Sequence, residues 1–247
     1  VNLPRSDFQP SGARSRLIPA RGLTAWAAFT RVGDHTMVMC DIVVLENEVN
    51  PVMSAALDSG LEVTALHNHF MWDSPKVMFM HIGGMGDEAE LARAVGRVFG
   101  KLKELISTRP TALTVNIDPA KTTFDPEDIE QIVGIAGVMK NGIYKIVVGR
   151  TARMGGREVG KEMGVNSWAA FAGSEQQAVV DGDFAMQESE VQDVLKTMRA
   201  ANINIVSIHN HMIGESPRYV FLHYWGVGPV EDLARGLKAA LAKQSGK

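Results

Sequence analysis

The chain has 247 residues, a formal net charge of −3, 45% hydrophobic residues and 21% charged residues. This is the composition of a globular protein with enough apolar side chains for a sizeable core. The slightly acidic balance argues against a nucleic-acid binder, which would carry a basic surface. No apolar run approaches the roughly 20 residues that span a bilayer, and a single cysteine, Cys40, excludes an intrachain disulfide.

The chain begins at Val1, and its opening stretch is not typical of a signal peptide. We therefore expect an upstream segment that processing or cloning has removed. Residues 1–7 resemble the end of a strand that recurs later in the chain. This similarity predicts a first unit that is incomplete at its N-terminus.

Strands and helices alternate through the first half of the chain. Apolar residues spaced by three and four positions predict a helix over 46–60, and Asp87 with Glu90 forms a capping-box-like start for another helix. Strands are expected at 24–31, 36–44, 62–70 and 76–83, with a tight turn at "WDSP". Residues 107–123 are expected to connect this half to the next.

The second half begins with a short predicted helix over 124–137, with Asp125 as N-cap and Pro126 at the first helical position. Asn141-Gly142 predicts a hairpin with a type I′ turn over 137–150. Further strands are expected at 166–172 and 177–186, followed by the pattern of the first half.

A constant offset of 142 residues aligns the two halves without a gap over residues 26–86, with 19 of 61 positions identical. "WAAF" meets "WAAF", "ENEV" meets "ESEV" and "HNH" meets "HNH". Internal repetition of this kind predicts a duplicated structural unit.

The repeated pattern predicts an α+β fold. Each unit reads β-β-α-β-β-α, with antiparallel sheets and helices packed on one face. We expect residues 1–106 to form the first unit, 107–123 the connector and 124–247 the second unit. The two units are predicted to pack as a pseudo-twofold pair.

Six of the seven histidines lie in two copies of one pattern. Side chains alternate along a strand, so two histidines spaced by two residues share a face, and the turn brings the third level with one of them. The predicted metal ligands are His67, His69 and His81 in the first unit and His209, His211 and His223 in the second.

Three imidazoles at this spacing suit a mid-sized transition ion, with a carboxylate or water completing the shell. Zn²⁺ or copper is the expected ion, and Fe or Mn becomes an option if carboxylates join. Glu188 and Glu215 are the candidate acids of the second unit, while Asp41 and Asp183 lie on the preceding strands. The competing interpretation is that the histidines only brace the hairpin through hydrogen bonds.

Two other interpretations of the histidine pattern are weaker. The letters of the HNH nuclease motif are scattered along that motif rather than adjacent, and this chain lacks a basic surface. His209, His211 and Glu215 match cupin spacing, but the predicted helices flanking them do not fit a barrel of strands.

Methionines are frequent, 13 in all, and "MVMC" and "MFMH" each place two on one strand face. They predict either flexible core filling or a soft thioether site for Cu(I). The glycines after each hairpin, at 83–86 and 226–228, are more typical of a strand-to-helix connection than of a phosphate-binding turn.

The stretches "ENEVNPVMSAAL", "ALHNHFMWDSPKVMFMHIGG" and "SIHNHMIGESPRYVFLHYWGVG" resemble the LppY/LpqO-like family of bacterial domains of unknown function. The resemblance extends over essentially the whole chain. It implies export to the periplasm or cell surface, with a lipid anchor or signal peptide upstream. It supplies neither a reaction nor catalytic residues, and "FMWD" replaces the second unit's "MIGE" in the first.

The sequence therefore predicts an exported metal-binding protein that holds or senses its ion through duplicated histidine sites. The alternative is a metal-dependent enzyme, a hydrolase or cupin-like oxidoreductase, with Glu188 or Glu215 as general base. The expected partners are the metal ion and, for the enzyme, a small-molecule ligand. Neither nucleic acid nor a membrane span is expected.

Overall fold

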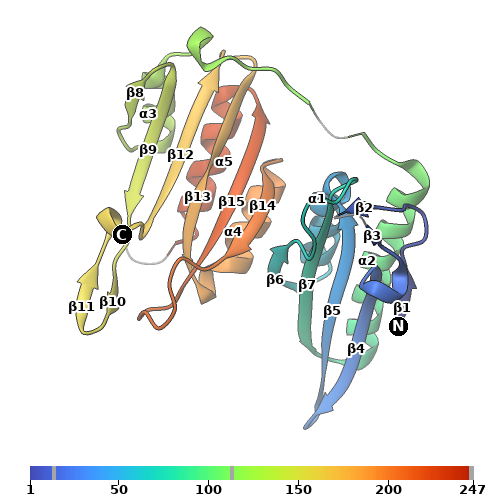
Figure 1. Cartoon of the computed structure of the whole chain (residues 1–247). Helices are drawn as coiled ribbons and strands as arrows, with labels where there is room; N and C mark the ends of the chain where they lie inside the picture. Colours follow the sequence, from blue (N-terminus) through green and yellow to red (C-terminus); the bar gives the residue numbers. More distant parts are fainter. Residues whose placement is uncertain (13–14, 112–113, 245–247) are drawn as a thin grey trace. The chain divides into compact units, whose positions relative to one another are not determined.

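A computed structural model describes residues 1–12, 15–111 and 114–244 of the chain (Figure 1). The chain divides into two compact units, Val1–Leu113 and Thr114–Lys247. Antiparallel sheets and, within the described residues, five α-helices make the protein α+β, which confirms the predicted class. None of the helices in the described part of the chain is both long and apolar enough to cross a membrane.

The first unit is an antiparallel sheet with two helices on one face. Its strands pair in the order β1-β4-β5-β7-β6. Their bounds are β1 Asn2–Pro4, β4 Thr24–Val32, β5 His35–Leu45, β6 Glu62–His67 and β7 Val77–Gly86, and the helices are α1 Glu46–Asp58 and α2 Glu88–Thr108. Both helices contact the central strands β5 and β7. A short hairpin, β2 Ser11–Gly12 with β3 Ser15–Arg16, and the single turn η1 Pro19–Arg21 precede β4.

The second unit has the same succession of main elements and additional ones at its start. Its strands pair in the order β8-β9-β12-β13-β15-β14. They are β8 Val138–Lys140, β9 Ile143–Gly149, β12 Asn166–Gly173, β13 Ala178–Gln187, β14 Asn204–His209 and β15 Tyr219–Gly228. The helices are α3 Pro126–Val133, α4 Val191–Ala200 and α5 Val230–Leu241, and the hairpin is β10 Ala152–Met154 with β11 Arg157–Val159. Short 3-10 turns are η2 Pro119–Lys121, η3 Lys161–Met163 and η4 Glu188–Glu190.

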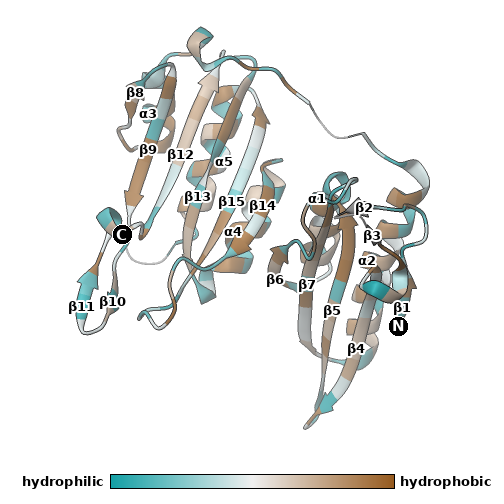
Figure 2. Cartoon of the chain, in the orientation of Figure 1, coloured by the Kyte–Doolittle hydropathy of each residue, from teal (hydrophilic) through white to brown (hydrophobic). Residues whose placement is uncertain are grey.

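The local sequence signals account for most of these elements. The Asp87 carboxylate accepts the N–H of Glu90 at 3.0 Å and begins α2 as predicted. Asn141 and Gly142 adopt φ of 53° and 76°, the conformation a two-residue hairpin requires. Hydrophobic and hydrophilic residues alternate along α2 (Figure 2), and its apolar side is buried on the sheet.

The strand expected at 62–70 is shorter than predicted. β6 ends at His67, and β14 ends at the matching His209. The side-chain amide of Asn68 donates to the carbonyl of Phe70 at 2.8 Å, so it closes a local turn that competes with the ladder. His69 is therefore a loop residue rather than a strand residue.

Each unit contains a buried arginine–glutamate pair at the start of a helix. Fully buried Arg5 contacts Glu48 at 2.8 Å, and Arg150 contacts Glu190 at 3.1 Å. Each glutamate also accepts the backbone N–H three residues before it. Such a pair satisfies both charges away from water, and losing either partner leaves an uncompensated buried charge.

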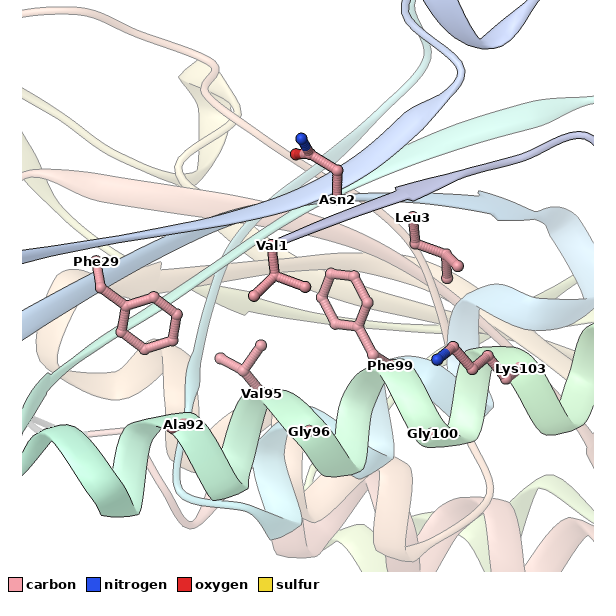
Figure 3. Close-up of a pocket in the computed structure, with 10 residues that line it drawn as sticks. All are labelled: Val1, Asn2, Leu3, Phe29, Ala92, Val95, Gly96, Phe99, Gly100 and Lys103. Atoms are coloured by element: carbon pink, nitrogen blue, oxygen red, sulfur yellow. The ribbon is translucent and has the colours of Figure 1, made fainter.

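The first unit has an apolar groove of about 330 Å³ between β1, β4 and α2. Val1, which precedes β1, and Phe29 of β4 point across it toward Val95 and Phe99 of α2 (Figure 3). In the second unit, α3 packs against α5, the corresponding helix. Among the described residues, α3 thus packs beside the last helix of the second unit, whereas the groove lies at the corresponding place in the first.

Candidate metal centre

Three histidines of the second unit gather on the sheet face opposite its helices. His223 lies within β15, where Gly226 faces Leu233 of α5, so the odd-numbered positions of this strand face away from the helix. His223 is directly opposite Asp183 of β13, which places both side chains on that face. His209 ends β14, and His211 follows in the loop.

The imidazole rings lie close together. Ring centroids of His209 and His211 are 5.1 Å apart, and those of His209 and His223 are 4.7 Å apart. In the sheet His209 is directly opposite Phe221, which is two residues from His223 along β15. The third histidine is therefore diagonal to the first instead of level with it, and the rings still converge.

Phe221 supports the histidine of the loop. His211 stacks on Phe221 with ring centroids 3.6 Å apart and planes 12° from parallel. The hairpin β10–β11 contributes to the apolar cluster around this ring. That buried cluster consists of Ala152, Val165, Ala185, Tyr219 and Phe221. The stacking holds His211 over the sheet, together with the contact of its Nδ1 with the carbonyl oxygen of Gly164 at 3.3 Å.

Asp183, His209 and His211 form a group able to hold a metal ion. One ligand atom from each lies within 4.8 Å of the other two. The Nε2 of His211 is 3.0 Å from the Oδ2 of Asp183. Asp183 is only 4% exposed, whereas the His211 side chain is 32% exposed, so the group is buried on one side and reachable from solvent on the other.

Two atoms of this group are buried without a hydrogen-bond partner. They are the Oδ1 of Asp183 and the Nδ1 of His209. A buried polar atom without a partner costs free energy, and an ion is one means of satisfying it. The donor set of one carboxylate and two imidazoles also fits a divalent transition metal.

The surroundings of His209 favour its neutral imidazole, the form that binds a metal. Burial lowers its pKa, and the neighbouring His223 and His211 lower it further, while Asp183 opposes them. Only the neutral imidazole binds a metal. The site therefore keeps this histidine in the state that coordination needs.

The other predicted site residues of the second unit lie outside the group. The Nδ1 of His223 is 3.2 Å from the carbonyl oxygen of Gly182. Glu215 is buried in the turn and accepts the N–H of Tyr219 at 2.9 Å. Glu188 is exposed and forms an ion pair with Arg218 at 3.3 Å.

The first unit arranges its histidines in the same way but less tightly. Ring centroids of His67 are 5.1 Å from His69 and 5.0 Å from His81. His69 stacks on Phe79 at 3.4 Å, and burial lowers its pKa. Asp41 is directly opposite His81, and its Oδ1 is buried without a partner. Among the described residues, however, only in the second unit do ligand atoms of three such side chains lie within 4.8 Å of one another.

Asp41 and Asp183 are acids whose closeness to the histidines sequence spacing alone does not reveal. They correspond at the offset of 142 residues, and the sequence places them on the strands that precede the histidines. The register of β5 with β7 and of β13 with β15 is what brings them to the histidines. The sequence signal for them is that an aspartate stands at this strand position in both halves of the chain.

The fold and site together define an α+β protein with a candidate metal centre on an open sheet face. The chain belongs to the family described as Domain of Unknown Function (DUF1259), whose sequence profile matches residues 1–101 and 127–243. One matched stretch lies in each unit. Comparison with curated proteins and with solved structures gave no significant match.

Proposed function

We propose that the second unit binds a divalent transition metal through Asp183, His209 and His211. The observation that carries this proposal is the convergence of three ligand atoms within 4.8 Å, two of them on residues with an unpartnered buried atom. If the histidines only stabilised the hairpin through hydrogen bonds, the Oδ1 of Asp183 and the Nδ1 of His209 would stay buried without a hydrogen-bond partner. An ion offers both residues a partner.

The chemistry of the ligands narrows the choice of metal ion. Imidazole suits Zn, Cu and Fe, and a carboxylate ligand also admits Mn. Zn²⁺ or copper remains our expectation. A water molecule or His223 would complete the coordination shell.

Holding or sensing an ion is the role we favour over catalysis. An enzyme would need an acid beside the metal-bound water. Glu188 is paired with Arg218, and Glu215 accepts a backbone N–H in the turn. Their role as general bases stays a prediction without a supporting contact.

We further propose that the two units arose by duplication and that the first holds a second, weaker site. The common element order and the matching buried ion pairs support the duplication. His67, His69, His81 and Asp41 would be the ligands of the weaker site. The pseudo-twofold arrangement stays a prediction.

Export is also part of the proposal. It rests on the resemblance to LppY/LpqO-like domains, which concerns the repeated histidine segments. Cell fractionation of the full-length protein tests it. Recovery of the protein in the cytoplasmic fraction alone would contradict export.

Elemental analysis of protein purified without a histidine tag tests metal binding. We expect one tightly bound ion per chain, and loss of that ion in Asp183→Ala and His209→Ala variants. Asp193→Ala, an exposed acid in the first turn of α4, is the matched control. Parent protein that is metal-free and fails to take up Zn²⁺ or Cu²⁺ in titration would refute the proposal.

A further inference from the structure

Methionines occupy two different environments in the first unit. Met53 and Met80 are fully buried in the core, as flexible core filling predicts. Met39 and Met85 are instead 59% and 55% exposed, and Met37 is partly exposed. Core packing therefore explains the first pair and not the others.

Three of the exposed or partly exposed methionines of the first unit, Met37, Met39 and Met85, share one sheet face. Met37 of β5 is directly opposite Met85 of β7, and Met39 is opposite Gly83. Side chains alternate along each strand, so these residues lie on the same face as Asp41 and His81. This is the face opposite the helices, because Gly84 on the other side meets Leu91 of α2.

The register brings the thioethers within reach of one ion. Directly opposite residues have Cβ atoms about 5 Å apart, and diagonal neighbours about 7–8 Å. Met37 and Met85 are such an opposite pair, and Met39 is diagonal to Met85. Gly83, opposite Met39, contributes no side chain between Met39 and Met85.

The second unit does not share this feature. At the constant offset of 142 residues, the three methionines correspond to Val179, Asp181 and Val227, and Gly83 corresponds to Trp225. The methionine face is therefore specific to the first unit. It is separate from the Asp183 group and from the function proposed for it.

We propose that Met37, Met39 and Met85 form a binding site for a soft monovalent metal ion, Cu(I). Thioether sulfur selects Cu(I) over harder divalent ions. The three sulfur atoms supply a neutral, solvent-accessible ligand set, and His81 lies on the same face two residues from Gly83. The site binds the ion without a change in its oxidation state.

Ag(I), a redox-inert probe of the same softness, tests the proposal in protein labelled with ¹³C at the methionine methyl groups. We expect the methyl signals of Met37, Met39 and Met85 to shift on addition of one equivalent, while those of Met53 and Met80 do not. Single Met→Leu variants assign the signals. Unshifted signals for all three residues would overturn the proposal.

Competition for Cu(I) against a chromogenic chelator under anaerobic conditions gives the affinity. The double variant Met39→Leu/Met85→Leu keeps the size and apolar character of both side chains. We expect it to bind Cu(I) at least about tenfold more weakly, a difference of about 1.4 kcal/mol. Met139→Leu, an exposed methionine of β8, is the control and should bind as the parent does.

Three results would count against the site. Equal Cu(I) affinity of parent and double variant would exclude the methionines as ligands. Self-association that the double variant abolishes, without any metal binding, would assign the face to a protein contact instead. Loss of Cu(I) binding in His211→Ala, with the methionine variants unaffected, would place the ion in the second unit. The divalent-metal titrations are independent of all three.

Discussion

In the first unit His69 stacks on Phe79 at 3.4 Å, and in the second His211 stacks on Phe221 at 3.6 Å. The backbone framework and the aromatic support of the two sites are thus alike. The difference lies in the aspartate, because His211 contacts Asp183 at 3.0 Å. Among the described residues, only Asp183, His209 and His211 place three ligand atoms close enough together to hold one metal ion. A shared framework can therefore keep its histidines while ligand geometry diverges.

The edges of the two units differ more than their sites. Phe29 and Phe171 correspond at the sequence offset of 142 residues, yet Phe171 is fully buried and Phe29 only partly. Ala234 of α5 is also fully buried, whereas its counterpart Ala92 is exposed beside the groove. α3 accounts for the difference, because it packs on α5.

This difference predicts the largest effects on stability. Phe171→Ala should cost about 3–5 kcal/mol in the free energy of unfolding, because it empties a closed core position. Phe29→Ala should cost about 1–2 kcal/mol, because part of that ring already contacts water. Urea unfolding followed by circular dichroism measures both. Equal losses would show that the groove does not weaken the packing of Phe29.

The metal sites give the next comparison. We expect His211→Ala to reduce Zn²⁺ affinity by about 100-fold or more, since even outer-shell changes cost 10–100-fold. His69→Ala should leave the tight site intact and remove only weaker binding. Isothermal titration of both variants against the parent is the measurement. A larger loss in His69→Ala would reverse the assignment of the tighter site.

The turns after the histidines give the smallest effect. Burial raises the pKa of Asp73, but the N–H of Val77 at 2.7 Å and the Lys76 ammonium at 3.1 Å outweigh it, so its pKa lies below the usual 3.8. Its stabilisation is therefore complete above that value and is lost as the pH falls through the lower folded pKa. Asp73→Asn should cost about 1–2 kcal/mol at neutral pH.

The acid dependence of unfolding checks this prediction. The parent should lose stability below about pH 4 more steeply than Asp73→Asn does. Asp34→Asn, in the exposed turn between β4 and β5, is the control and should follow the parent. If the free energy of unfolding depended on pH in the same way in parent and Asp73→Asn, the charge of Asp73 would not stabilise the turn.

Local sequence patterns were sufficient for the main elements. The α+β class, the start of α2 at Asp87 and the Asn141-Gly142 turn are confirmed, because each depends on periodicity or on capping and turn chemistry within a few residues. The hairpin β10–β11 was not predicted. Its strands have three residues each, too few to show an alternating pattern.

The candidate site could be predicted only in part. The convergence of the histidines follows from their spacing, but His69 and His211 reach it from loops, where side-chain stacking and not strand alternation sets their position. Asp183 joins through the pairing of β13 with β15, which sequence spacing alone does not specify. The exposure of Met39 and Met85 likewise depends on which strand face the helices cover.

Anomalous diffraction from crystals of the tag-free protein grown with Zn²⁺ is the most direct test of the metal centre. We predict a peak at the zinc absorption edge bonded to Asp183, His209 and His211 in the second unit. A zinc peak only elsewhere, with the His211 Nε2 still hydrogen-bonded to Asp183, would contradict the account.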